Sequence, residues 1–353
     1  MRILMVGVDQ STQGGMWTVV ENYLKNAEFC KKTNLKYIPT SITGSFVKKI
    51  SFTFISYIKI FFELSRKKYD VVHIHVSERG SIYRKYIVLL MARLWKCKTI
   101  FHMHGAEFEV WYRSCSDKKK KYIRKIVNKA DRILILGEYW KDFLCSLVEQ
   151  PEKIQVLYNA VEVPEKNKYR IEARKLLFLG VVGKIKGMDD LLAAMKNIDD
   201  KLDEDIKLYI YGPDFSYGIE QRIKKSGLEN RVDYKGWLEK EEKEKVMDEI
   251  AINILPSYNE GLPMTILETM ARGIPNITTS IAAIPEAVSK ENGILLKPGD
   301  VQGLQQAILT LMDSEKIRQE KSDKSFETIK EKFSLEKHIH EVLHIYNELE
   351  KSI

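Results

Sequence analysis

The sequence lacks the usual marks of secreted, disulfide-bonded and membrane-spanning proteins. It contains only four cysteines, which are scattered and form no C-x-x-C pair, so neither a disulfide framework nor a cysteine-based zinc site is expected. Its longest apolar stretch, residues 50–64, is interrupted by Lys59 and Glu63, which argues against a membrane-spanning helix. The N-terminus enters an apolar strand without the charged region and cleavage site of a signal peptide. We therefore expect a globular protein located in the cytoplasm.

The sequence lacks a dinucleotide-binding motif and offers only a weak candidate for a metal-binding one. Gly7 is followed by Gly14 and Gly15, a spacing that differs from the G-x-G-x-x-G of dinucleotide-binding folds. The two later glycines precede a helix, where they either serve only a turn or let a phosphate or a sugar approach the backbone. The one D-x-D string, residues 203–205, lies in a charged turn, where we expect its side chains to be solvated.

The histidines offer no metal site by this interpretation. His102 and His104 lie at the end of a predicted strand, 98–102, immediately before Gly105. They share a direction only if the strand continues through both, which the glycine argues against, and no third ligand is in view. His104 follows a strand of an open α/β sheet, where either a ligand contact or a structural role is consistent with the sequence. We expect neither a metal ion nor a cofactor.

The charge is distributed unevenly along the chain. Residues 1–160 contain 28 Lys and Arg against 14 Asp and Glu, a net +14, and the other residues contain 29 against 35, a net −6. A basic half is suited to nucleic acid, an anionic membrane surface or acidic substrates. The segment 46–68 mixes aromatic residues with lysines, and its apolar residues are too many for one narrow face, so we expect most of them in the core. Residues 118–132 form a basic helix, either a solvated face or a membrane-surface helix.

Strands and helices alternate along both halves of the chain. This pattern predicts an α/β protein with two doubly wound parallel sheets, and a cleft between them is the default binding site. The polar segment that follows the strand at 153–161 is the best candidate for a boundary. We therefore predict domains at 1–160 and 161–334, followed by a C-terminal helix at 335–353 that packs on the first domain.

The stretch 252–275 is the most informative in the chain. It reads as a buried strand, a tight loop and a short helix, with Pro263 at the first helical position and Gly273 at the end. Glu268 lies on the outer side of this helix, and Glu260 lies in the loop before it. Two carboxylates beside free helix amides suit a ligand with both hydroxyls and phosphates, although spacing alone favours solvated side chains. The inner side of the helix consists of Ile266, Leu267 and Met270.

Several motifs occur in register and in order along the chain. Together they closely resemble the family-4 retaining glycosyltransferases of the GT-B fold, which include bacterial enzymes of capsule, exopolysaccharide and lipid-linked oligosaccharide synthesis. The motifs of the second half are FLGVVGKIKGMDDLLAAM (178–195), LYIYGP (208–213), VDYKGWL (232–238), LPSYNEGLPMTILETMARGIP (255–275), IPEAV (284–288) and NGILLKPGD (292–300). Those of the first half are the glycine loop at 14–15, HMHGAEF (102–108) and VLYNAVE (156–162).

The resemblance implies a role for each matching residue. Glu260 would bind hydroxyls of the donor sugar, and Glu268 would bind the ribose of the nucleotide. Lys186 would bind the diphosphate, where a compact cation neutralises the charge that develops on the leaving group. His104 would lie near the donor sugar and the reacting carbon, and Gly15 would approach the donor phosphates.

Gly261 and Leu262 match the family's donor-binding loop, which follows Glu260. At another position the chain departs from the family pattern. The family often has an arginine where this chain has Val181, and Lys184 is our candidate for the missing second cation. The same departure leaves open a degenerate chain that acts as a non-catalytic partner subunit.

The function implied is transfer with retention at the anomeric carbon and without a metal ion. The expected donor is a UDP-sugar, and the expected acceptor is a lipid-linked oligosaccharide or a similar glycan in surface polysaccharide synthesis. In this family the first domain binds the acceptor, and its net +14 favours a peripheral position on the inner face of the cell membrane. A soluble small molecule or a protein is the alternative acceptor. Nucleic acid is not an expected partner, because no recognised nucleic-acid module is present.

Overall fold

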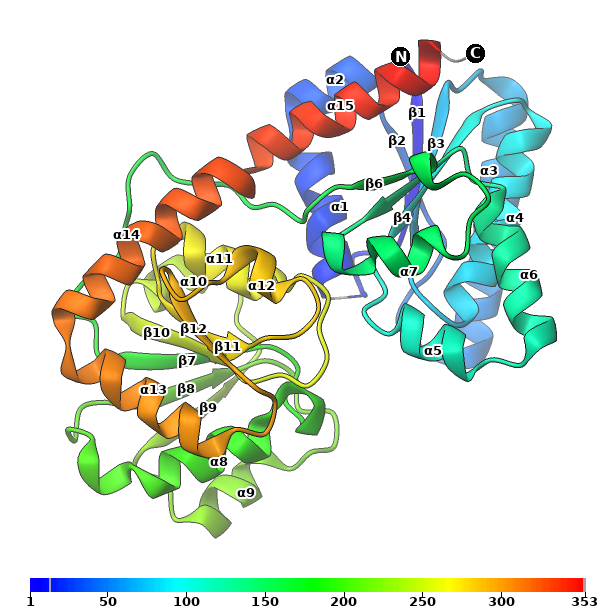
Figure 1. Ribbon diagram of the computed structural model, residues 1–353. Helices are drawn as coiled ribbons and strands as arrows, with labels where there is room; N and C mark the ends of the chain where they lie inside the picture. Colours follow the sequence, from blue (N-terminus) through cyan, green and yellow to red (C-terminus); the bar gives the residue numbers. More distant parts are fainter. Residues whose placement is uncertain (13, 352–353) are drawn as a thin grey trace. The chain divides into compact units, whose positions relative to one another are not determined.

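The computed structural model describes residues 1–12 and 14–351, which fold into two compact units (Figure 1). Unit 1 comprises Met1–Ala160 together with Leu335–Ile353, and unit 2 comprises Val161–Ser334. The chain therefore returns to unit 1 through its last helix, α15 (Leu335–Lys351). The final two residues of the predicted segment 335–353 lie outside the described part.

Unit 1 is built on one parallel sheet. Within the described residues its strand order is β2-β1-β3-β4-β5-β6, and helices connect the successive strands. All six residues of β3 are buried, as expected for a parallel strand covered on both faces. The strands are β1 (Ile3–Gly7), β2 (Lys36–Pro39), β3 (Val71–Val76), β4 (Lys98–Met103), β5 (Arg132–Ile135) and β6 (Ile154–Val156). The helices are α1 (Gly15–Lys25), α2 (Ala27–Thr33), α3 (Phe46–Arg66), α4 (Gly80–Leu94), α5 (Phe108–Ser114), α6 (Asp117–Asn128) and α7 (Lys141–Cys145), with 3₁₀ turns η1 (Glu138–Trp140) and η2 (Pro151–Lys153).

Unit 2 repeats this design with a different strand order, β12-β11-β10-β7-β8-β9. Chain order reverses between β7 and β10, and such a switch point is where open α/β sheets bind ligands, beyond the carboxyl ends of the strands. The strands are β7 (Lys175–Leu179), β8 (Leu208–Tyr211), β9 (Val232–Gly236), β10 (Ile250–Leu255), β11 (Asn276–Thr279) and β12 (Gly293–Leu296). The helices are α8 (Met188–Asn197), α9 (Ile219–Ser226), α10 (Lys240–Met247), α11 (Met264–Ala271), α12 (Ile284–Ala287), α13 (Val301–Asp313) and α14 (Glu315–Lys332), with 3₁₀ turns η3 (Lys184–Lys186) and η4 (Asp199–Lys201).

The central helix of the sequence argument, α11, begins one residue later than predicted. Pro263 has a ψ of 128°, which is extended, so it caps the helix instead of forming its first residue. Gly273 follows the helix with a φ of 73°, the left-handed geometry that favours glycine at a helix end. The predicted inner side is buried, and the side chain of Glu268 is 21% exposed.

The prediction that most apolar residues of 46–68 lie in the core is wrong. Helix α3 packs against unit 1 through a narrow side, and most of its aromatic and aliphatic side chains face away from the unit. The physical reason is that only a narrow side of α3 meets the rest of the unit, and this side tolerates two polar residues because carbonyls satisfy their hydroxyls: Thr53 donates to Thr40 outside the helix and to Lys49 within it, and Ser56 donates to Phe52 within it. The buried residues of α3 are Thr53, Ser56, Ile60 and Leu64.

The basic helix predicted at 118–132 is α6, which ends at Asn128. Ile123, Ile126 and Val127 are buried, and Lys118, Lys119 and Lys121 are exposed. None of the described helices is both long enough and apolar enough to cross a bilayer.

Candidate active site

Two loops meet at the switch point of unit 2. One follows β7 and contains the η3 turn, and the other follows β10 and leads into α11. The amide of Tyr258 donates a hydrogen bond to the carbonyl of Ile185 at 2.8 Å, which ties the loops together. Gly187 has a φ of 73°, and a Cβ atom there would lie 2.0 Å from the carbonyl oxygen of Pro256. Only glycine therefore allows this approach of the two backbones.

Lys186 and Glu260 form an ion pair across these loops. The Lys186 Nζ lies 2.6 Å from Glu260 Oε1, and the Ser257 hydroxyl donates to the same oxygen at 2.8 Å. Glu260 is only 8% exposed, so it is not the solvated loop residue that spacing alone would also permit. The structure thus brings together two of the predicted residues and adds Ser257, which the sequence argument missed.

Glu268 forms an ion pair with a different lysine of the chain. Its Oε2 lies 2.6 Å from the Nζ of Lys243, which comes from the neighbouring helix α10. Lys243 belongs to a run of alternating charges, KEEKEK, that carries no motif, so no sequence signal identifies it. A ligand hydroxyl that binds Glu268 must therefore share or displace this ammonium group.

The remaining predicted donor residues occupy the same two loops. Gly261 is half-buried, and Leu262 is buried beneath the loop. Val181 and Lys184 are both exposed in the segment after β7, and the ammonium group that contacts Glu260 belongs to Lys186.

The D-x-D string lies away from these loops and binds a cation of the chain itself. Arg174 contacts Asp203 and reaches both carboxylate oxygens of Asp205 at 3.1 Å. These hydrogen bonds lower the pKa of Asp205. The two carboxylates remain largely exposed, which agrees with the predicted solvated turn.

His104 and Gly15 belong to unit 1, whereas Lys186, Glu260 and Glu268 belong to unit 2. Gly15 is the first residue of α1 and is exposed. His104 follows β4, and its amide donates to the carbonyl of Val76 at 2.7 Å.

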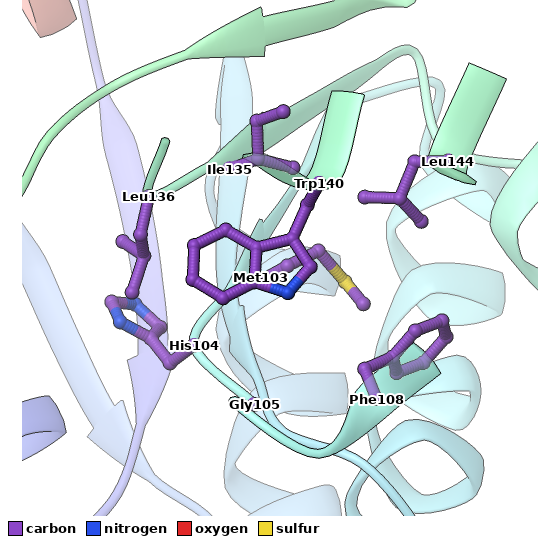
Figure 2. Close-up of a pocket in the computed structure, with 8 residues that line it drawn as sticks. All are labelled: Met103, His104, Gly105, Phe108, Ile135, Leu136, Trp140 and Leu144. Carbon is purple, nitrogen blue, oxygen red and sulfur yellow. The ribbon is translucent and has the colours of Figure 1, made fainter. Parts of the chain in front are cut away.

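His104 borders a small apolar pocket in unit 1. Figure 2 shows its imidazole beside Leu136 and the indole of Trp140. The next residue, Gly105, admits no side chain, because a Cβ atom there would lie 2.9 Å from the amide nitrogen of Glu78. The pocket is lined by Met103, His104, Gly105, Phe108, Ile135, Leu136, Trp140 and Leu144.

The expectation that His102 and His104 point in different directions without a further histidine nearby is wrong. Their ring centroids are 4.2 Å apart, and His73 and His75 of β3 join them. The reason is the register of the sheet: His75 pairs with His102 on the adjacent strand, and residues two apart on a strand share a face.

Nitrogens of His73, His75 and His102 lie within 4.8 Å of one another, a spacing that invites comparison with a metal site. The orientation of the rings does not favour one. His73 and His75 are stacked at 4.7 Å with 15° between their planes, so their in-plane lone pairs run nearly parallel instead of converging. His73 Nε2 also shares a hydrogen bond with His102 Nδ1 at 3.1 Å.

Burial keeps these histidines neutral. Loss of solvent lowers the pKa of His73 to about 3, with smaller contributions from His104 and His338. Burial likewise lowers the pKa of His75, His102 and His104 well below 6.5. All four imidazole rings are therefore uncharged at neutral pH.

Two family models match the chain and together span most of it. Glycosyltransferase Family 4 matches residues 23–164, and Glycosyl transferases group 1 matches residues 162–332. The chain belongs to these glycosyltransferases. The border between the two matches falls where the polypeptide passes from unit 1 to unit 2.

Individual relatives of this glycosyltransferase are distant but extend over its length. It is 26% identical to an uncharacterized 41.2 kDa protein in the cps region of Klebsiella pneumoniae, over 97% of this chain and 99% of the relative. It is 26% identical to the UDP-Gal:alpha-D-GlcNAc-diphosphoundecaprenol alpha-1,3-galactosyltransferase of Escherichia coli, over 73% of this chain and 70% of that protein.

Solved structures support the fold. Anabaena HepE in complex with UDP superposes with a TM-score of 0.77 at 14% identity, covering 99% of this chain and 100% of that one. The predicted α/β GT-B fold, with two Rossmann-like domains, is confirmed.

Proposed function

We propose that this glycosyltransferase transfers a sugar from a UDP-sugar, with retention and without a metal ion, to a lipid-linked glycan acceptor in surface polysaccharide synthesis. The observation that carries the proposal is the ion pair between Lys186 and Glu260 at the switch point of unit 2, 2.6 Å long and largely buried. A paired cation and carboxylate at this edge offer one group for a diphosphate and one for sugar hydroxyls.

Each group then has a separate task when the donor binds. Lys186 turns to the diphosphate, aided by the free amides at the start of α11, and Glu260 accepts hydrogen bonds from donor-sugar hydroxyls. Ser257 continues to hold Glu260 in place. Glu268 accepts a hydrogen bond from the ribose, and Gly261 and Leu262 shape the loop between the two carboxylates. Lys184 supplies the second positive charge near the phosphates.

In the proposed reaction the acceptor hydroxyl attacks the anomeric carbon from the face that the diphosphate leaves. The new carbon–oxygen bond forms as the bond to the diphosphate oxygen breaks, and the hydroxyl proton passes to the departing diphosphate. Lys186 stabilises the charge that develops on the leaving group. Gly15 lets the donor phosphates approach the backbone of unit 1, and His104 contacts the donor sugar.

The names of relatives support the substrate classes. The Escherichia coli relative takes UDP-Gal and acts on a diphosphoundecaprenol-linked sugar, and the Anabaena structure contains UDP. The relative in the cps region of Klebsiella pneumoniae supports a role in capsule or related polysaccharide synthesis. A lipid-linked acceptor places the enzyme at the inner face of the cell membrane, where the basic first half of the chain favours anionic lipid.

A thermal-shift screen with UDP, GDP and ADP tests the donor. A nucleotide present at a hundredfold its dissociation constant stabilises the protein by about 2.7 kcal/mol, so the correct base is the one that raises Tm. Radiolabelled UDP-sugars with an undecaprenyl-diphosphate-linked sugar then test transfer. We expect turnover that is lost in Glu260→Ala and Lys186→Ala. UDP binding without turnover for any UDP-sugar would instead identify a degenerate partner subunit.

A further inference from the structure

Helix α3 presents its apolar side to solvent. The residues of this side, the α3 stripe, recur at helical spacing along the whole helix, opposite the buried side. Phe54 in the centre is 64% exposed. Polar residues at the inner side and apolar residues at the outer side are the reverse of an ordinary surface helix. The α3 stripe consists of Val47, Ile50, Phe54, Ile55, Ile58, Phe61 and Phe62.

The stripe has a basic border. Lys48, Lys59 and Arg66 lie along one edge of it at spacings of eleven and seven residues, which align on a helix. The helix contains one acidic residue, Glu63, which is drawn inward by a 2.5 Å hydrogen bond from Tyr69 and a 3.0 Å ion pair with Lys67. The exposed side of α3 is thus apolar and positively charged, without an exposed carboxylate among its described residues.

The apolar surface continues onto the neighbouring helix α4, which packs beside α3 (Figure 1). The ring of Phe61 meets that of Trp95 edge to face, with centroids 4.9 Å apart. Next to Trp95, Leu94 is 70% exposed, and Leu90 and Ile87, one and two turns earlier, are also exposed. A contiguous apolar patch on two adjacent helices indicates an interaction surface, unlike single apolar residues scattered over a surface.

We propose that the α3 stripe inserts into one leaflet of a lipid bilayer, so that the enzyme is held by apolar burial as well as by charge. The proposal deepens the peripheral location given above and rests on it. A helix of 21 residues is about 30 Å long and can lie in the plane of the interface with its lysines at the phosphate level. A second copy of the chain is the less suitable occupant, because it would bring the same cationic borders together in a buried contact.

Vesicle binding at two salt concentrations separates apolar insertion from electrostatic adsorption. We would measure flotation with phosphatidylcholine vesicles and with vesicles that also contain phosphatidylglycerol, in 0.1 M and 1 M salt. At 1 M salt the Debye length is about 3 Å, so adsorption by charge alone is abolished. We expect binding that persists at 1 M salt and on pure phosphatidylcholine, and we expect Phe54→Ser to weaken it about tenfold and Phe54→Ser/Ile58→Ser further.

The matched control is Phe215→Ser, which removes an even more exposed phenylalanine, 79% exposed, from unit 2 and should leave vesicle binding unchanged. The UDP thermal shift of every variant reports folding and donor binding independently, so failure of this inference is distinguishable from failure of the proposed function. Binding that vanishes at 1 M salt in the native chain refutes insertion. Insertion is also refuted if the native chain sediments as a dimer that Phe54→Ser dissociates, while vesicle binding is absent or is unchanged by the substitution.

A second inference concerns the proton of His104. Its Nε2 lies 2.8 Å from Nδ1 of His75, and because both rings are neutral only one of these nitrogens carries a proton. The other nitrogen of His75, Nε2, is fully buried and has no hydrogen-bond partner within the described residues. The adjacent Cδ2 faces Gly7, whose carbonyl accepts from the buried ammonium group of Lys85 at 3.0 Å. A lone pair suits that surrounding, whereas an N–H would be an orphaned buried donor.

We infer that His75 carries its proton at Nδ1 and donates it to Nε2 of His104. His104 must then carry its own proton at Nδ1, so it meets the donor sugar as a hydrogen-bond donor and not as a base. His75 is in this sense a positioning residue, which acts by fixing the tautomer of its neighbour. The inference rests on the proposed role of His104, but its test does not require turnover.

Nitrogen-15 NMR of the chain labelled at histidine reports which ring nitrogen bears the proton, and His104→Gln identifies the signals of His104. We expect Nδ1 to be protonated in the native chain and in His75→Asn, whose amide can donate from nearly the same position as Nδ1. His75→Phe keeps the stacking but cannot donate a hydrogen bond. In this variant we expect His104 to populate both neutral tautomers. A His104 protonated at Nε2 in the native chain refutes the inference, whatever the variants do.

Discussion

The ion pair of Lys186 and Glu260 allows a quantitative prediction. Replacing Lys186 by Met keeps most of the side-chain volume and leaves the Glu260 carboxylate, 8% exposed, without its cation. At the observed 2.6 Å the gross Coulomb attraction is about 332/(20 × 2.6), or about 6 kcal/mol at an effective dielectric constant of 20. Desolvation of both ions offsets most of this, and the side chain of Lys186 retains 26% exposure. We therefore expect Lys186→Met to lower the free energy of unfolding by about 1–3 kcal/mol.

A double-mutant cycle isolates the interaction energy between Lys186 and Glu260. Glu260→Gln removes the charge but retains an oxygen that accepts from Ser257, so we expect a smaller loss in that variant. In the double variant Lys186→Met/Glu260→Gln no unpaired charge remains, and stability should recover toward that of the single Gln variant. The coupling energy expected between the two sites is about 1–2 kcal/mol. Urea unfolding followed by circular dichroism measures it, with the transition of unit 2 assigned by its shift in UDP.

The same variants test the division of roles between the two residues. Lys186→Met should weaken UDP binding at least about tenfold in calorimetry, since a diphosphate contact is lost. Glu260→Gln should leave UDP binding nearly unchanged and weaken only the binding of the UDP-sugar. The reasoning is refuted if the coupling energy is below about 0.3 kcal/mol, or if Glu260→Gln weakens UDP and UDP-sugar equally.

Three further predictions follow from individual contacts. Gly187→Ala places a Cβ atom against the Pro256 carbonyl at a positive φ, so we expect a loss of about 3 kcal/mol or more and a clear fall in Tm by calorimetry. Glu268→Ala should weaken UDP binding about tenfold, whereas Lys243→Ala should leave it unchanged or a few-fold tighter, because that ammonium group competes with the ribose; equal losses in titration calorimetry would contradict this. Burial lowers the pKa of Lys85 to about 7 from 10.5, so the unfolded chain binds the proton more strongly between these values. The free energy of unfolding should thus rise with pH across about 7 to 10.5, and the rise should be smaller in Lys85→Met.

Much of the framework is readable from the sequence because buried parallel strands are continuous apolar runs between turn residues. The strand predicted at 98–102 is β4, which is one residue longer, and the predicted C-terminal helix begins at residue 335 as expected. The partners of the site residues were also missed: Ser257 is one polar residue among several in its loop, and Lys243 reaches Glu268 only through the packing of two helices.

The two wrong predictions have a common physical cause. Periodicity tells which side chains share a face, but it does not tell what that face meets. His73 and His75 necessarily point the same way along β3, yet only the pairing of β3 with β4 brings His102 and His104 onto them. The many apolar residues of α3 were likewise visible in the sequence, but not which side of the helix meets the rest of unit 1; that side carries Thr53, whose hydroxyl donates to the carbonyl of Thr40. An apolar helix side that the protein itself does not cover must be covered by something else, and the basic border of the α3 stripe makes a lipid surface the best match in charge.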